Sequence, residues 1–465
     1  MSTGDGDSSG SRFGTFRGSS SRGSARRERP GAPPRTGGGG FGFYNFSVSP
    51  VFRPASVAEL GDVLALCRVR GDRPVFRGAG RSYGDAAINP RGPVIDLSGL
   101  KAVLSLDPET GIVRAEAGVT IGDLWRLSVP RGFWPPVVTG TMHVSLGGAV
   151  AVNVHGKNGW RKGTLAEHVL ELAILRRSGE VERIPKDDLR FAGLVGNTRA
   201  EEPIVEVVLK LKKVATGYLD VEGFATLDLA STLQALDEAK DAWEYVVAWT
   251  DCFARGASLG RSVVHVANEH AHRNGEGSGF SEAEQLADVK TGPLPVPLML
   301  LGLRLTAKGP QMRAVNAARY LAGRLAGRTH FRQSLVAYSF LLDYLPAWNE
   351  VYRPGGFIQY QLFVPKERAK GAFERAIGLQ HEHGVVSSLA VMKRHRADSF
   401  PRAYASDGFS LALDFPVTSG NAGRLLRLCR AYDRLLLDVG GRVYRAKDCV
   451  GTFERLAAAR GTPSP

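Results

Sequence analysis

The sequence predicts an α+β protein with two folded units, and three observations lead to this fold class. Short runs of β-branched and aliphatic residues alternate with longer helical patterns through the first half of the chain. A second series of strand and helix patterns follows from about residue 216. The 465 residues, 43% of them hydrophobic, are enough for two to three ordinary cores. We therefore expect one unit over residues 41–215 and another over residues 216–441.

Residues 1–40 fit neither unit. They are rich in Gly, Ser, Arg and Pro and nearly lack aliphatic side chains, so they cannot bury enough surface to fold. We predict that this tail is disordered and that order begins near Phe41.

In the first unit, helix starts carry capping residues. Ser56 precedes a helix over 57–70, Thr120 with Asp123 forms a capping box, and Ser145 begins a further short helix. Loops at 107–111 and 178–179 predict hairpins. The expected strands are 74–77, 94–97, 103–106, 112–115, 170–177, 181–184 and 204–211.

The second unit shows the same two periodicities. Helical patterns cover 227–243, 312–325, 367–381 and 420–438. Strand patterns cover 245–249, 357–363, 387–392 and 410–415. Between them, residues 268–293 are polar and rich in Gly, and we expect a mobile loop there.

Composition limits the possible partners. The net charge of +14 is spread along the chain without a basic cluster that contains aromatic residues, so nucleic-acid binding is not expected. A diffuse positive field suits an anionic substrate or a lipid surface, and a simple arginine bias explains it equally well. No apolar run approaches the ~18–20 residues of a membrane span, and no signal peptide is visible. We expect a cytoplasmic protein without a metal site, because the His-x-His pairs at 270/272 and 381/383 lack a third ligand.

A first glycine-rich loop follows the strand at 74–77. Glycine lets successive backbone N–H groups converge into a nest that can hold a pyrophosphate, although an ordinary tight loop is the alternative. The loop does not continue directly into a helix, as the dinucleotide fingerprint requires. The candidate cofactor residues here are Arg77, Gly78, Ala79, Gly80, Arg81, Ser82, Tyr83 and Gly84.

A second candidate segment lies some 60 residues downstream. Its small residues at a helix start should offer unpaired N–H groups to phosphate, and the loop that follows brings together an imidazole, an ammonium and an amide. Taken alone, the histidine of this loop would more often have a structural role. The candidate residues are Gly140, Thr141, Ser145, Gly147, Gly148, Asn153, His155, Gly156, Lys157 and Asn158.

Together, Arg-Gly-Ala-Gly-Arg-Ser-Tyr-Gly-Asp at 77–85 and His-Gly-Lys-Asn at 155–158 resemble the decaprenylphosphoryl-β-D-ribose 2′-oxidase family. This family belongs to the vanillyl-alcohol-oxidase superfamily of flavoproteins. The resemblance continues at 356–361, 413–416 and 440–448 and covers roughly residues 45–455. It implies a PCMH-type FAD-binding domain over 41–215 and a substrate domain with an antiparallel sheet over 216–441. A shortened segment, 442–465, would return to the FAD domain.

The resemblance also implies a reaction. The family oxidises a secondary hydroxyl of polyprenyl-phosphate-linked ribose to a ketone, and a separate NADH-dependent reductase completes the epimerisation. FAD should bind non-covalently, because Arg81 stands where superfamily relatives carry the attachment histidine. A lipid-linked substrate would allow peripheral association with the inner face of the membrane. The alternatives are an oxidase or dehydrogenase of a soluble sugar, alditol or cyclitol, and a non-catalytic flavin-fold protein.

The same resemblance assigns roles to single residues. Lys447, His155 and Tyr83 are the catalytic candidates, and Lys157 and Lys393 are candidates for a substrate phosphate. The remaining candidates are Gln359, Gln361, Trp249 and Ala412 for substrate, with Ala412 in place of a family cysteine, and Tyr444 and Ile204 for the flavin.

Two stretches depart from the family or stand apart from it. The segment before Ile204, residues 196–203, departs from the family's glycine-rich pattern. The apolar stretch 293–305 is either an ordinary buried element or a lip for a lipid tail.

Overall fold

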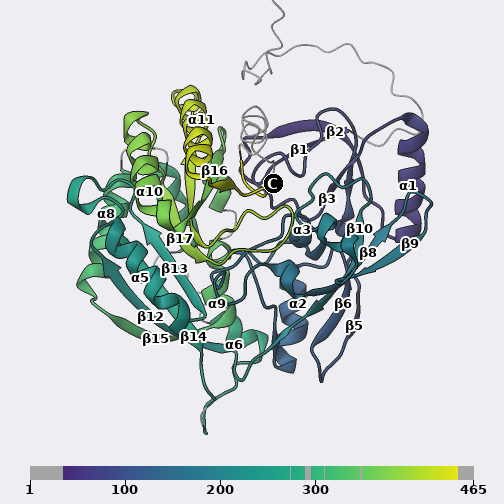
Figure 1. The fold of residues 1–465 in the computed structure, drawn as a ribbon, viewed down its shortest axis with the longest axis horizontal. Coiled ribbons are helices and arrows are strands. Elements are labelled where there is room, and N and C mark those ends of the chain that lie inside the picture. Colours follow the sequence, from purple (N-terminus) through teal and green to yellow (C-terminus); the bar gives the residue numbers. More distant parts are fainter. Residues whose placement is uncertain are drawn as a thin grey trace, which may run out of the picture.

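The computed structural model describes residues 35–272, 274–287, 295–307, 309, 311–345 and 348–448. Figure 1 shows the first half of the chain and the second half lying side by side, each around its own sheets. The helices are α1 (Val57–Arg70), α2 (Ile121–Ser128), α3 (Leu146–Ala151), α4 (Leu189–Leu194), α5 (Leu229–Ala242), α6 (Glu282–Ala287), α7 (Val296–Thr306), α8 (Met312–Leu325), α9 (Leu335–Ser339), α10 (Lys366–Glu382) and α11 (Ala422–Val439).

The first half contains a four-stranded sheet in the order β1-β2-β4-β3 and a five-stranded antiparallel sheet in the order β5-β6-β10-β8-β9. A short pair, β7 with β11, lies beside them. The strands are β1 (Arg35–Gly39), β2 (Phe46–Phe52), β3 (Val75–Arg77), β4 (Val94–Asp96), β5 (Val103–Leu106), β6 (Ile112–Glu116), β7 (Phe133–Trp134), β8 (Val169–Leu175), β9 (Val181–Pro185), β10 (Ile204–Lys210) and β11 (Lys212–Lys213).

The second half is built on one eight-stranded antiparallel sheet in the order β15-β12-β14-β13-β17-β18-β16-β19. Helices α5, α10 and α11 cover one face of this sheet (Figure 1) and enclose a core with its inward-pointing apolar side chains. The strands are β12 (Tyr218–Thr226), β13 (Tyr245–Thr250), β14 (Ser262–Glu269), β15 (Thr329–Ser334), β16 (Phe357–Pro365), β17 (Leu389–His395), β18 (Gly408–Pro416) and β19 (Arg442–Val443).

Strand register places the polar candidates of the second half on the opposite face. Gln361 of β16 lies opposite Ala412 of β18, which lies opposite Val391 of β17. The next row holds Gln359 and Asp414, and Lys393 pairs with Ser410 on the other side. Because side chains alternate along a strand, these residues share one face while their neighbours fill the core beneath the helices.

The two halves also share a core. An apolar cluster around the five-stranded sheet, α2 and α3 continues into residues of the second half, including Leu335, Phe340, Phe363, Tyr404 and Tyr444. The two halves therefore meet through packed side chains next to the polar face of the large sheet.

Local signals in the sequence placed many elements correctly. The Ser56 side chain accepts from the N–H of Glu59, and Thr120 and Asp123 form the expected capping box. The predicted helices over 57–70 and 312–325 have the expected bounds, and the predicted hairpins are β5–β6 and β8–β9.

Three expectations were wrong in part. Order begins before Phe41, because the backbone of β1 pairs with β2 from Arg35 onward, and residues 1–34 lie outside the described residues. Strands β12, β14 and β15 were missed, although they form one side of the large sheet. The stretch predicted as a mobile loop contains α6 and the end of β14, and residues 288–294 of it are not described.

The beginning of that stretch is also held by side chains. His270 Nδ1 lies 2.8 Å from an Asp220 carboxylate oxygen, and its Nε2 lies 2.7 Å from Glu276. These contacts attach the loop to β12. The sequence pattern of the loop shows only polar residues and does not indicate this attachment.

Candidate active site

A cavity opens between the first glycine-rich loop, the loop before α3, and the segment after β19. Twelve of the predicted residues line it: Gly78, Ala79, Gly80, Arg81, Ser82, Tyr83, Gly140, Thr141, Ser145, Gly148, Tyr444 and Lys447. The structure thus brings together segments that lie more than 350 positions apart in the sequence.

The two glycine-rich segments touch at Gly78 and Ser145. The Ser145 hydroxyl accepts from the N–H of Ala79 at 3.3 Å, and a Cβ on Gly78 would lie 2.0 Å from that hydroxyl oxygen. Gly80 has a φ of +65°. Gly78 permits the close approach and Gly80 permits the left-handed turn, both without strain. This explains why glycine occupies these two positions.

The start of α3 differs from the prediction. The N–H groups of Leu146 and Gly147 donate to the carbonyls of Val119 and Ala117, both at 2.8 Å. These two N–H groups are therefore not available to a phosphate, and Ser145 receives Ala79 instead of capping its own helix. The first glycine-rich loop, the Ser145 side chain, and Gly148 and Ala151 of α3 line this side of the cavity.

The other residues of the second segment lie outside the cavity wall. Asn153 has a φ of +47°, and its side chain accepts from Ala166, while Asn158 donates to the carbonyl of Pro136 at 2.9 Å. His155 lies behind Tyr444, with ring centroids 5.0 Å apart, and accepts from Gln361 at 3.1 Å. These residues fix the backbone and the orientation of the groups in front of them.

The remaining cofactor candidates are placed beside the cavity. Arg77 contacts Gly80 and Gly39 beneath the first loop, and Gly84 lies against the backbone of Lys447. Ile204 begins β10 and is buried at the sheet. Lys157 reaches the carbonyl of Tyr338, and its ammonium lies 4.3 Å from the centre of that ring.

The segment after β19 joins the two halves at the cavity. The N–H of Tyr83 donates to the carbonyl of Ala446 at 2.9 Å, and the Lys447 ammonium lies 4.1 Å from the centre of the Tyr83 ring. Asp448 exchanges two hydrogen bonds with the backbone of Gln359, at 2.9 and 3.0 Å. Lys447 is therefore fixed between the first glycine-rich loop and β16.

Burial shifts the titration of the basic groups towards neutral pH. It lowers the pKa of Lys447 to about 8, although Asp414 and Asp448 act in the opposite direction. Burial and the charge of a neighbouring lysine lower the pKa values of Lys157 and Lys393 to about 7. Burial, followed by the charge of Lys393, holds the pKa of His155 well below its ordinary value, so this imidazole is neutral.

Beyond the cavity, the polar face of the large sheet is not fully covered, and we call this partly open strip the cleft. Val391, Lys393 and Ala412 are partly exposed on this face, in the middle of the sheet. Gln361 is buried beside them and donates to His155. Trp249 lies at the far end under Arg319, whose guanidinium is 4.7 Å from the centre of the indole ring.

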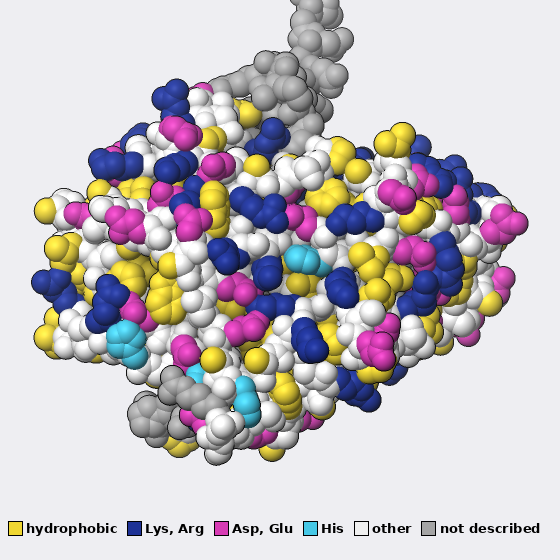
Figure 2. All heavy atoms as spheres, turned by 60° about the horizontal axis from the view of Figure 1, so that its bottom comes forward, with side chains coloured by type: hydrophobic (Ala, Val, Ile, Leu, Met, Phe, Trp, Pro, Cys, Tyr) yellow, Lys and Arg dark blue, Asp and Glu magenta, His cyan; other side chains and the backbone are white. Residues whose placement is uncertain are grey.

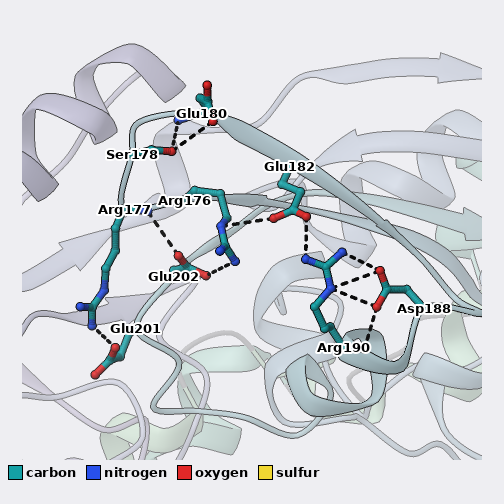
Figure 3. Close-up of polar contacts among 9 residues, drawn as sticks. All are labelled: Arg176, Arg177, Ser178, Glu180, Glu182, Asp188, Arg190, Glu201 and Glu202. Carbon is teal, nitrogen blue, oxygen red and sulfur yellow. Dashed lines mark hydrogen bonds and ion pairs between the residues drawn. The ribbon is translucent and has the colours of Figure 1, made fainter.

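The segment 196–203 is held by ion pairs instead of the family's glycines. Glu202 pairs with Arg176 at 3.1 Å and Glu201 pairs with Arg177 (Figure 3). Arg199 donates to the carbonyl of Asp85 at 3.1 Å, so the segment is tied to the first glycine-rich loop, and Thr198 lines the cavity. The altered segment therefore still forms part of the wall.

Sequence reasoning missed several groups of the site. Asp414 and Asp448 are buried beside Lys447, and His395 is buried against His155 with ring centroids 5.1 Å apart. Their only signal in the sequence is that they lie inside or next to strands whose other residues are apolar. A carboxylate or imidazole at such a position is expected to be buried and therefore to have a partner.

Comparison with known proteins identifies the family of the chain. The FAD-binding domain family matches residues 48–185. Decaprenylphosphoryl-β-D-ribose oxidase of Mycolicibacterium smegmatis is 31% identical over 423 residues, which cover 87% of this chain and 88% of the relative. The chain belongs to this oxidase family. It is an FAD-dependent oxidoreductase that acts on CH–OH groups.

Other relatives act on related compounds. L-gulono-1,4-lactone dehydrogenase of Mycobacterium tuberculosis is 32% identical over 370 residues, covering 78% of this chain and 79% of the relative. Alditol oxidase of a Streptomyces species is 31% identical over 173 residues, covering 37% and 40% of the two chains. The relatives of this chain thus include oxidoreductases of a lactone and of alditols.

The cavity fits FAD. Gly78 and Gly80 keep the backbone of the first loop open towards the cavity, and the buried Nε of Arg81 has no hydrogen-bond partner among the described residues. A buried unpaired donor at a cavity wall is expected where an anionic or carbonyl-bearing group binds. Arg81, Thr141 and Ser145 are among the polar side chains that would contact it.

The surface adds three observations. Among the described residues, no helix is long and apolar enough to span a bilayer. On the face in Figure 2, basic and acidic side chains are interspersed. The apolar stretch predicted as a core element or lip is helix α7, in which Leu298, Leu301 and Leu305 are exposed while Leu300 and Leu303 pack towards Tyr83 and Tyr352.

Proposed function

We propose that the enzyme oxidises a secondary hydroxyl of polyprenyl-phosphate-linked ribose to a ketone. The observation that carries this proposal is the continuity of the site. Lys447 stands at the cavity beside Tyr83, and the adjoining cleft holds Lys157 and Lys393, two basic groups whose charged forms a bound phosphate would stabilise. A sugar between these groups would have its hydroxyl near the flavin and its phosphate in the cleft.

Bound FAD supplies the hydride acceptor in this reaction. The neutral amine of Lys447 takes the hydroxyl proton at Nζ, since burial brings its pKa within reach of physiological pH. Gln361, oriented by His155, and Gln359, oriented by Asp414, present amide groups towards the sugar hydroxyls. The Tyr83 ring supports the Lys447 ammonium and closes the cavity on that side.

We further propose that residues 41–215 bind FAD, that residues 216–441 bind substrate, and that the segment from residue 442 completes the cavity. A separate NADH-dependent reductase would consume the keto product. A lipid-linked substrate would bring the enzyme to the inner face of the membrane without inserting it.

The test is anaerobic reduction of the flavin by a panel of substrates. Prenyl-phosphate ribose is expected to bleach the flavin absorbance at a rate at least ~10²-fold above that of free ribose, alditols or lactones, because those lack the phosphate. Equal or faster bleaching by a neutral polyol would contradict this proposal and favour a second candidate function.

That second candidate is oxidation of a soluble sugar, lactone or alditol. It is favoured by the 32% identity to a lactone dehydrogenase over most of both chains. The same panel decides between the two, because a neutral substrate makes no use of Lys157 and Lys393.

The lipid tail can be tested at α7. Its exposed leucines offer apolar surface, and each buried methylene of a prenyl chain would contribute about 0.8 kcal/mol. We expect Leu298→Asp/Leu301→Asp to abolish any preference, measured as kcat/KM, for a long over a truncated prenyl chain. Leu189→Asp, at an exposed position of α4, is the matched control. An unchanged preference in the double variant would exclude α7 as the lip.

A further inference from the structure

Four basic groups lie in succession along the polar face of the large sheet. Lys393 is on β17 and His265 is on β14, two strands away, which corresponds to about 10 Å. Lys157 lies between the two halves at the same face, and Arg319 extends from α8, which covers the far end. The row runs from the flavin cavity to the outer end of the cleft.

These basic groups have no acidic counterpart. In the described part of the chain, none of the four forms an ion pair with a carboxylate. They act on one another instead: burial, followed by the charge of Lys393, lowers the pKa of Lys157 to about 7, and burial, helped by Lys157 and Arg319, lowers that of His265 to about 4, so this imidazole is neutral. A bound anion would favour the charged forms of these groups, so an anion is the expected complement.

The outer end of the row is accessible and fixed in position. Arg319 is exposed, Lys157, Lys393 and His265 are partly exposed, and Trp249 holds the Arg319 guanidinium at its ring face. Helix α8 is anchored by Tyr320, whose hydroxyl donates to the carbonyl of Thr226 at 3.1 Å. A guanidinium held in this way presents a planar pair of donors that suits a phosphate.

We propose that Arg319, with His265 and Lys157, forms an outer anion subsite that receives the phosphate of the substrate. This inference rests on the proposed function and adds the orientation of the bound substrate to it. The sugar lies at the Gln361 and Lys447 end, and the phosphate lies at the α8 end with Lys393 between them. The ligand class is a glycosyl phosphodiester, and inorganic phosphate is its simplest analogue.

The first experiment uses inorganic phosphate with the FAD-loaded enzyme, following the unfolding temperature as phosphate is titrated. Arg319→Gln is expected to weaken phosphate binding about tenfold, whereas Arg324→Gln, an exposed arginine near the end of the same helix, should leave it unchanged. Equal affinity in wild type and Arg319→Gln would overturn the subsite. An equal loss in both variants would also overturn it, since it indicates only a general charge effect.

The second experiment compares substrates. Arg319→Gln should raise KM for prenyl-phosphate ribose about tenfold with kcat unchanged, and Arg319→Lys should recover part of the loss because it restores the charge without the planar fork. A fall in kcat with unchanged KM contradicts the assignment. If wild type does not oxidise the phosphate-linked sugar, the proposed function fails, while the phosphate titration still decides the subsite.

Discussion

At the scale of single residues, burial determines what the basic side chains of the site can do. Lys447 is enclosed by Tyr83 and the backbone of both halves, which disfavours its charged form, while Asp414 and Asp448 favour it. The balance leaves an amine that exchanges a proton near neutral pH. An exposed lysine would stay charged there and could not accept one.

Replacing Lys447 tests this role. We expect Lys447→Ala to bind FAD with an unchanged absorbance spectrum and to reduce it at least ~10²-fold more slowly, because the proton acceptor is lost. In wild type, the reduction rate should rise with pH through about 8, as the amine becomes neutral. Rapid reduction in the alanine variant, or a rate that falls across this range, would show that Lys447 is not the base.

The lysines of the cleft should make stability depend on pH. The pKa of Lys393 is about 7 in the folded protein and 10.5 in its unperturbed state, so unfolding takes up a proton between these values and stability rises with pH there. The slope is at most about 1.4 kcal/mol per pH unit. Lys393→Met should therefore stabilise the protein more at pH 6.5 than at pH 9, measured as the difference in unfolding temperature from wild type.

Lys366→Met serves as a control, because Lys366 is an exposed lysine. A stabilisation by Lys393→Met that is the same at both pH values would mean that Lys393 titrates normally.

At the scale of elements, two features build the site. Glycine allows two loops to pack closely together, and each strand presents alternate residues to two different environments. The first glycine-rich loop reaches Ser145 only because position 78 lacks a Cβ. Along β16, Gln359 and Gln361 face the cleft while Tyr360 and Leu362 fill the core beneath the helices. A shift of one residue in this register would bury the polar groups of the site and expose the core.

The glycine contact gives a direct test. Gly78→Ala is expected to lower FAD affinity at least tenfold, because its Cβ would lie 2.0 Å from the Ser145 hydroxyl and push the loops apart. Gly78→Ala/Ser145→Ala should recover part of the affinity by removing that oxygen. Gly61→Ala, in α1 with nothing within 4 Å of the new Cβ, is the matched control. Fluorescence titration of the apoprotein with FAD measures all three, and normal affinity in Gly78→Ala would refute the contact.

At the scale of the whole molecule, the candidate active site lies where the two halves meet. Its parts come from the first loop, the loop before α3, three strands of the large sheet, and the segment that carries Lys447. The shared core around Phe363 and Tyr444 holds these parts in place. FAD, bound at the junction, should stabilise the fold as a whole.

Non-covalent binding of FAD is the prediction at this scale. Arg81 stands at the position of the covalent attachment residue of superfamily relatives, and a guanidinium forms no such bond. Acid precipitation should release all flavin to the supernatant, and the unfolding temperature of the apoprotein should rise with added FAD concentration. Flavin retained in the protein pellet would contradict the prediction.

The sequence by itself determined what depends on neighbouring residues. Helix caps such as Ser56 and Thr120 act within four positions, hairpin turns join adjacent strands, and the spacing of Gly78 and Gly80 specifies a turn. Each of these signals is a local preference of the backbone. Resemblance to a known family then supplied the cofactor and the roles of distant residues such as Lys447.

Only the tertiary structure decided which polar groups share an environment. No local signal links Asp414 to Lys447, shows that the α3 N–H groups are taken by Val119 and Ala117, or brings Arg319 to Trp249. These contacts join residues far apart in the chain, and their effect depends on burial between two halves. Burial is a property of the packed molecule, and for that reason the charge state of the site cannot be derived from the order of its residues.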